Sequence, residues 1–178
     1  RHDTNGTTGQ VTATINGNSA VLATLSAASS SDSALTITVN DAATAAEGKS
    51  IVDATDAGTV AFSAGVTDSF ANLTSGTAVS TNMQAIDAKD ANVNVTVSDG
   101  NLALSSADNV TALNALMGAN TTGTTTATIN GASALLGGLQ AHGTNFPMVL
   151  VVLESETAYP MHRRQKVVLQ PLILAFLD

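Results

Sequence analysis

Short segments of alternating apolar and polar residues recur along the chain from Val11 onward. A period of two is typical of half-buried β-strands, and the alternating residues are mostly Val, Ile and Thr, which favour extended structure. The pattern predicts strands at 11–16, 34–40, 59–63, 92–98, 102–105 and 124–130.

Between these strands the apolar residues follow helical spacing, which places them on one face of a helix. The clearest case puts Val110 and Leu113 on the same side. Ser19 and Asp108 suit helix N-caps, and Gly118 suits a C-terminal stop. The spacing predicts helices at 19–28, 42–54, 79–88 and 108–118.

The predicted order alternates strands with short helices. Such an order favours βα units with right-handed crossovers and a largely parallel sheet. We therefore expect an α/β fold in which short strand–helix repeats stack as a solenoid-like array. An all-β sandwich repeat is the alternative, because several of the helical predictions rest on weak patterns rich in Ala and Thr.

An 18-residue segment occurs twice in the chain. Residues 8–25 and 122–139 agree at 12 of 18 positions, at an offset of 114 residues, and both contain TATING without a break. We therefore interpret 1–141 as a repeat region that holds one unit of 114 residues and the start of a second. Arrays of this kind stack units that cannot bury their apolar faces alone.

The composition changes near residue 142. Residues 2–142 hold eleven acids and two bases, whereas 143–178 hold three of each, together with all three prolines. We therefore treat 142–178 as a compositionally foreign tail. When the codons for this tail are read one frame over, their degeneracy allows Ser-Ala-Ala-Glu-Gly followed by Val-Asp. The first copy continues in a similar order, with TAAEG at 44–48 and VD at 52–53. A frameshifted reading of the second copy is our hypothesis, and a native amphipathic C-terminal segment is the alternative.

Composition excludes several classes of function. The formal net charge is −8, whereas a nucleic-acid binder needs basic residues, so we expect no nucleic-acid partner. The chain has no cysteine for disulfides or thiol chemistry. Histidine is absent from 3–141, which argues against a Ser-His-Asp triad or a histidine metal site there. We expect no catalytic residues, no enzyme activity and no cofactor, calcium excepted.

The acids of the repeat region include two close pairs, Asp53 with Asp56 and Asp87 with Asp90. Because few bases are available to pair with them, we interpret them as a solvated acidic surface. The alternative is weak calcium binding in turns rich in Asp and Asn, because calcium prefers several oxygen ligands. The candidate metal ligands are Asp41, Asp99 and Asn101.

Neither a membrane span nor a signal sequence is predicted. The longest uncharged apolar run, at 167–177, contains Pro171 and is shorter than the roughly 20 residues that a transmembrane helix needs. The chain opens on the polar RHDTNGTTG, which lacks the pattern of a secretory signal and resembles the interior of a longer protein.

The segment 65–118 carries a spaced pattern of residues that suggests a family. The pattern consists of Val66, Thr67, Asp68, Ala71, Asn72, Leu73, Met83, Ile86, VTVSD at 95–99 and LALS at 102–105. It resembles repeats of large type-I-secreted, calcium-associated bacterial adhesin and hemolysin-like proteins. The resemblance implies a bacterial cell-surface or extracellular location, no catalysis in the repeat, and calcium-dependent stiffening of the wider protein. The glycine-rich calcium nonapeptides of that family are missing from this sequence.

Together these patterns favour a non-catalytic structural or adhesive repeat of a bacterial extracellular surface protein. It would act as a spacer or as a module that contacts the cell surface or matrix. Its expected partners are neighbouring repeats of the same chain, surface polysaccharide or other cells. The alternative is an accessory carbohydrate- or polymer-binding module of a secreted enzyme, which would present exposed aromatic side chains. The aromatic residues of 1–141 are Phe62 and Phe70.

Overall fold

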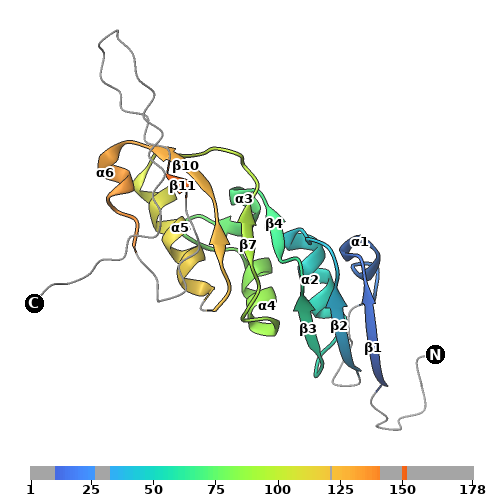
Figure 1. Ribbon diagram of the computed structural model, residues 1–178. Coiled ribbons are helices and arrows are strands. Elements are labelled where there is room, and N and C mark those ends of the chain that lie inside the picture. The colour runs from blue at the N-terminus through green and yellow to red at the C-terminus, as the bar shows by residue number, and fades with distance from the viewer. Residues whose placement is uncertain (1–10, 27–32, 121, 141–149, 152–178) are drawn as a thin grey trace, which may run out of the picture.

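A computed structural model of the protein describes residues 11–26, 33–120, 122–140 and 150–151. Strands and helices follow one another in chain order along an elongated body. This body runs from β1 at one end to β10 and α6 at the other (Figure 1). Most of the tail predicted at 142–178 lies outside the described residues.

Three small parallel sheets form the body, and neighbouring strands in each come from successive passes of the chain. The first sheet contains β1 (Val11–Gly17), β2 (Ser33–Val39) and β3 (Thr59–Phe62) in that order. The second contains β4 (Val66–Asp68), β7 (Val95–Val97) and β9 (Thr125–Thr126). The third contains β8 (Leu102–Leu104), β10 (Thr128–Gly131) and β11 (Leu150–Val151). One antiparallel hairpin joins β5 (Thr74–Ser75) to β6 (Ala78–Val79).

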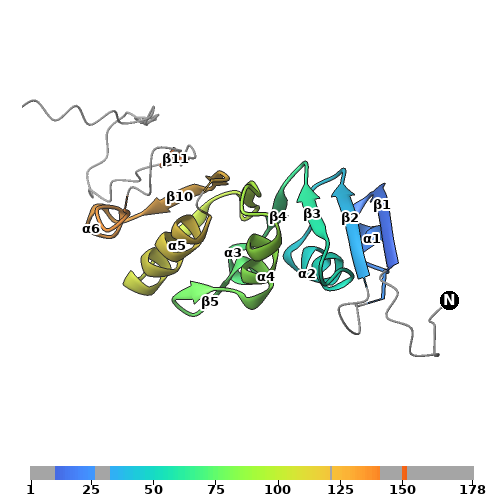
Figure 2. The same cartoon turned by 90° about the horizontal axis from the view of Figure 1, so that it is seen from below.

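The helices connect consecutive strands, and α2, α4 and α5 lie along one side of the strands (Figure 2). Their bounds are Ser19–Leu22 for α1, Ala45–Asp53 for α2, Phe70–Leu73 for α3, Thr81–Lys89 for α4, Ala107–Ala119 for α5 and Ser133–Leu136 for α6. The described residues thus divide into successive strand–helix units, which we number from one to five. The units span 11–22, 33–53, 59–89, 95–119 and 125–136.

The sheets are joined because the chain bends within a unit. In the third unit β3 pairs with β2, and β4 pairs with β7 after a turn at 63–65. A bridge between Ala43 and Val66 extends the second sheet back into the second unit. One apolar core runs beneath all of them, from Leu22 near one end to Ile129 near the other. Each unit therefore contributes to a core that its neighbours complete.

The two copies of the repeated segment fold alike. In the first copy a strand (β1) leads into the four-residue helix α1, and in the second copy β9 and β10 lead into the four-residue helix α6. Ser19 and Ser133 begin these helices, 114 residues apart. The same sequence thus adopts the same local structure at both ends of the body.

The predicted α/β class with mostly parallel sheets is confirmed, and the all-β sandwich alternative is wrong. Two cap predictions are also wrong, because Asn18 and Ser106 occupy the N-cap positions in place of Ser19 and Asp108. Gly118 lies inside α5 and does not end it.

The first helix is shorter than predicted, since α1 ends at Leu22. The predicted end of this helix, at 27–28, lies outside the described residues.

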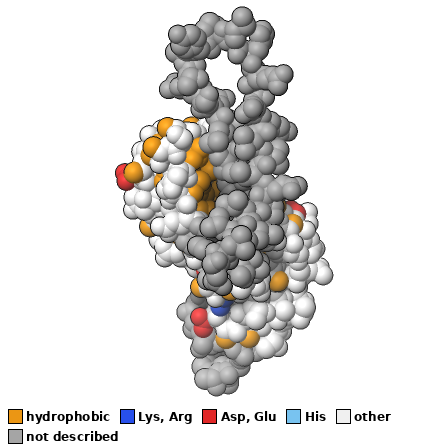
Figure 3. All heavy atoms as spheres, turned by 60° about the vertical axis from the view of Figure 1, so that its left-hand side comes forward, with side chains coloured by type: hydrophobic (Ala, Val, Ile, Leu, Met, Phe, Trp, Pro, Cys, Tyr) orange, Lys and Arg blue, Asp and Glu red, His pale blue; other side chains and the backbone are white. Residues whose placement is uncertain are grey.

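The surface of the described residues carries few charges. On the face shown in Figure 3, acidic and basic side chains are scattered among polar and apolar atoms and do not gather into a patch. Among the described residues no helix has the length and apolar character needed to cross a bilayer.

Candidate functional site

Three aspartates at the carboxyl ends of strands each bond the helix of the preceding unit. We call Asp41, Asp68 and Asp99 the cap row. In every case the donor is the backbone N–H of the first residue of that helix. The bonds join Asp41 Oδ1 to Ser19 N at 2.6 Å, Asp68 Oδ2 to Ala45 N at 3.0 Å, and Asp99 Oδ2 to Phe70 N at 2.5 Å.

The cap row places a carboxylate where a helix exposes unpaired N–H groups. The first turn of a helix has N–H groups without intrahelical acceptors, and its dipole attracts negative charge. Asp68 makes the most contacts, since its Oδ1 also accepts from Ser69 N and from Asn72 Nδ2, both at 2.8 Å. The cap row therefore ties the first four units together through charge-assisted bonds.

A second set of polar side chains follows the helices. We call Thr55, Asp90 and Asn120 the corner row, because each lies where the chain leaves a helix for the next strand. Thr55 and Asp90 bond back to the strand of the unit that they leave, and Asn120 bonds back to a residue just before such a strand. The bonds are Leu35 N to Thr55 Oγ1 at 2.9 Å, Phe62 N to Asp90 Oδ2 at 2.8 Å, and Asn120 Nδ2 to Val93 O at 2.9 Å.

Two of these corners share a glycine three residues later. Gly58 N donates to Thr55 Oγ1 at 3.1 Å, and Gly123 N donates to Asn120 Oδ1 at 3.0 Å. A Cβ atom would lie 2.0 Å from the backbone carbonyl oxygen of Leu35 at Gly58 and of Val93 at Gly123. No side chain fits at that distance, so glycine lets the chain pass close to its neighbour.

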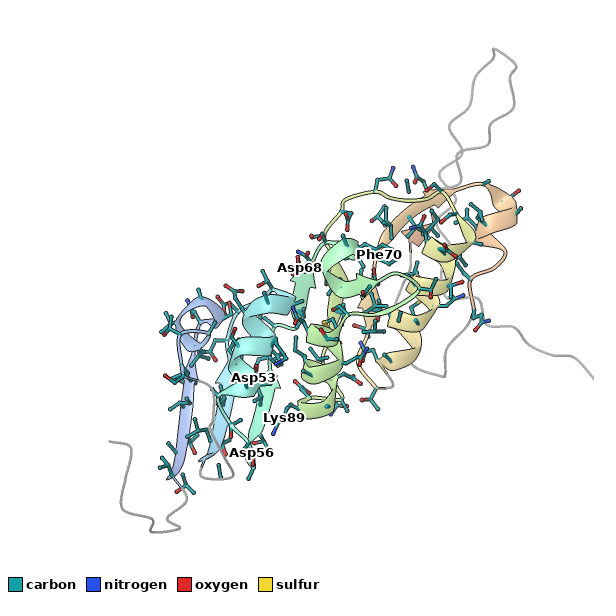
Figure 4. All side chains as sticks on the ribbon, turned by 180° about the vertical axis from the view of Figure 1, so that it is seen from behind. Asp53, Asp56, Asp68, Phe70 and Lys89 are labelled. Atoms are coloured by element: carbon teal, nitrogen blue, oxygen red, sulfur yellow. The ribbon has the colours of Figure 1, made fainter. Side chains whose placement is uncertain are left out.

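The two rows lie toward opposite ends of the strands. Figure 4 shows Asp68 and Phe70 together at one end, whereas Asp56 and Lys89 lie near the other. At that second end Lys89 Nζ donates to Asp56 O at 2.5 Å, which joins α4 to the connection before β3. Polar bonds to other passes of the chain therefore lie toward both ends of the strands.

The predicted carboxylate pairs have different surroundings. Asp53 pairs with Lys49 at 2.5 Å in a partly exposed ion pair within α2. Asp87 Oδ1 is buried without a hydrogen-bond partner among the described residues. Burial raises the pKa of Asp87, and repulsion from the charge of Asp90 raises this pKa further.

The candidate calcium ligands lie on the cap row and the turn beside it. Asp41 and Asp99 accept helix N–H bonds in different units, and Asn101 N donates to Asp99 O at 2.6 Å. Within the described part of the chain, His, Asp and Glu side chains form no group of three or more that could hold a metal ion. Calcium binding stays a prediction.

Sequence reasoning missed Asp68 and the whole corner row as a set of contacts. Two signals were present, namely an Asp at or just after a strand and a Thr or Asn three residues before Gly58 or Gly123. Their partners lie 20 to 29 residues earlier, so pairing could not be assigned from local spacing. The arrangement supports a mechanical role, because the cap row joins one unit to the next and the corner row ties the end of a unit to its own strand region.

Comparison of the chain with protein-family models, with curated proteins and with solved structures gave no match.

Proposed function

We propose that the described units form a solenoid-like array and that the protein is a structural spacer of a bacterial extracellular surface protein. The surface location rests on the resemblance of 65–118 to repeats of large secreted adhesins. The fold supports the mechanical part, because strands and helices follow one another along a single axis.

The observation that carries the proposal is the pairing of the cap row with preceding helices. Asp41, Asp68 and Asp99 lie at or just after the carboxyl end of a strand in three consecutive units, and the carboxylate of each accepts from the helix of the unit before it. A solenoid is stabilised by nearest-neighbour interfaces of this kind, which can be repeated without limit along the axis. Carboxylates that are engaged in bonds between units support a role in building an extended array rather than a role in catalysis.

The alternative of a carbohydrate-binding module receives less support from the described residues. Binding of sugar rings usually depends on exposed aromatic faces, because these combine apolar area with a polarised ring. Phe62 and Phe70, the aromatic residues of the described segments, are 4% and 7% exposed and belong to the core.

Surface labelling tests the proposed role. Antibodies raised against the full chain should bind intact cells of the source bacterium, and added protease should remove the epitope while an internal marker protein survives. Labelling that requires lysis of the cells contradicts a surface spacer.

A further inference from the structure

The repeated segment is buried in its second copy and exposed in its first. Thr125, Ala127 and Ile129 are 1%, 2% and 0% exposed. At an offset of 114 residues they correspond to Val11, Ala13 and Ile15. Val11 is 59% exposed, Ala13 is exposed and Ile15 is half-buried. Equivalent positions of equivalent strands therefore differ in burial.

The fourth unit covers the second copy. β9 pairs with β7 and β10 pairs with β8, in parallel register. Val95 N donates to Thr124 O at 2.7 Å, and Asn94 Oδ1 accepts from Thr124 N at 2.9 Å. Among the described residues β1 pairs with β2 alone, so the strand edge that β9 and β10 use toward the fourth unit is free on β1.

The helices show the same difference. Leu135 of α6 is partly buried against the core, and α6 contacts α5. The corresponding residue of α1 is Val21, which is 68% exposed. Val11 and Val21 are the large apolar side chains that the described surface leaves most exposed. Both lie in the first unit, on the positions that the fourth unit covers in the second copy.

We propose that this face of the first unit is a docking surface for a second copy of the segment 94–119, carried by a preceding repeat of the same polypeptide. The face, which we call the leading face, comprises the free edge of β1, Val11, Ala13 and Val21. The inference rests on the proposed array and specifies the joint between successive repeats. At this joint, strands equivalent to β7 and β8 of the preceding repeat pair in parallel with β1.

A separate molecule of this chain is a poorer occupant. The edge that β7 and β8 would offer is already taken by β9 and β10 in each molecule. A second molecule would have to unpair its own fifth unit before its fourth unit could bind. A preceding repeat has no such cost, because its fourth unit is followed directly by the strand it covers.

Cysteine labelling tests this joint, because the chain contains no cysteine. Two proteins carry the Val11→Cys substitution. One is the full chain, and the other is a duplicated chain in which an extra copy of 8–121 precedes residue 8 and the cysteine lies only in the downstream copy. We expect maleimide labelling of Val11→Cys to slow by about tenfold or more in the duplicated chain, because labelling then requires local opening. Thr12→Cys is the matched control, since Thr12 and its counterpart Thr126 are both exposed, and its rate should not change.

Equal labelling rates for Val11→Cys in the two chains would overturn the proposal. Slow labelling in the single-copy chain would do the same, and a dimer detected by light scattering would then identify a second molecule as the occupant. Ala13→Cys gives an independent probe of the same edge if Val11→Cys impairs folding. Failure here leaves surface labelling of cells unaffected, so the joint and the proposed location are tested separately.

Discussion

Two buried threonines show how differently one residue type can contribute. Thr55 and Thr125 are 2% and 1% exposed. The Thr55 hydroxyl accepts from the N–H groups of Leu35 and Gly58. The Thr125 hydroxyl is buried and has no partner among the described residues. The first copy of the repeated segment carries a valine, the exposed Val11, at the position of Thr125.

Replacing each threonine by valine should therefore change stability in opposite directions. Thr55→Val leaves two N–H groups without their acceptor and should lower the free energy of unfolding by about 2 kcal/mol. Thr125→Val removes an unpaired buried hydroxyl and should raise it by about 1 kcal/mol. Urea unfolding of the full-length variants at one pH measures both. Destabilisation of similar size in the two variants would contradict these roles.

Asp87 should make stability depend on pH. Its pKa is raised in the folded state by burial and by Asp90, so ionisation of Asp87 opposes folding at neutral pH. This penalty is fully present above the raised pKa and is lost as the pH falls toward the unfolded value of 3.8. Asp87→Asn should thus be more stable than the parent at pH 7, with a difference that narrows toward pH 4. A difference that stays constant over that pH range would contradict this origin.

At the scale of elements, the contacts that fix a helix start come from another unit. Asp68→Ala removes the acceptor of Ala45 N at the start of α2, together with the bond from Asn72. The loss of such a cap should cost about 1–2 kcal/mol of unfolding free energy. Asp108→Ala is the control, because Asp108 is exposed in the first turn of α5 and should cost only a few tenths of a kcal/mol. Equal losses of unfolding free energy for the two variants in urea would contradict the stabilising role of the Asp68 carboxylate.

The distinction between local signals and contacts from another unit explains which elements could be predicted from the sequence. Strands such as β2 were predictable because alternation of Leu, Ile and Val with Thr is a local signal. α3 and the hairpin of β5 and β6 were missed, because elements of four and two residues are too short to show a period. The predicted start of the first helix at residue 19 agrees with α1, but Ser19 was expected to cap the helix. The acceptor of the Ser19 N–H is an aspartate 22 residues later, which local spacing cannot identify.

The candidate site was less predictable than the fold. Asp41 and Asp99 were selected as oxygen ligands for calcium, and the structure shows both bound to helix N–H groups. Choosing between a ligand and a cap requires knowledge of which helix start lies next to the carboxylate. That information is tertiary, and local sequence does not contain it.

At the scale of the whole molecule, one core passes through every described unit, from Leu22 to Ile129. Small residues and short strands limit the apolar area that one unit can bury by itself, so stability is expected to depend on neighbours. The proposed first repeat contains four successive strand passes, which begin at residues 11, 33, 59 and 95, before the second copy of the 18-residue segment begins. The distance that one repeat adds along the array should therefore be set by the spacing of its paired strands.

Small-angle X-ray scattering from chains with one, two and three copies of 8–121 tests the central claim of a growing array. Paired strands lie about 4.8 Å apart, so each added copy should extend the maximum dimension by an equal step on the order of 20 Å, with an unchanged cross-sectional radius. A cross-section that widens with copy number, or a maximum dimension that grows only as a compact globule does, would contradict the array.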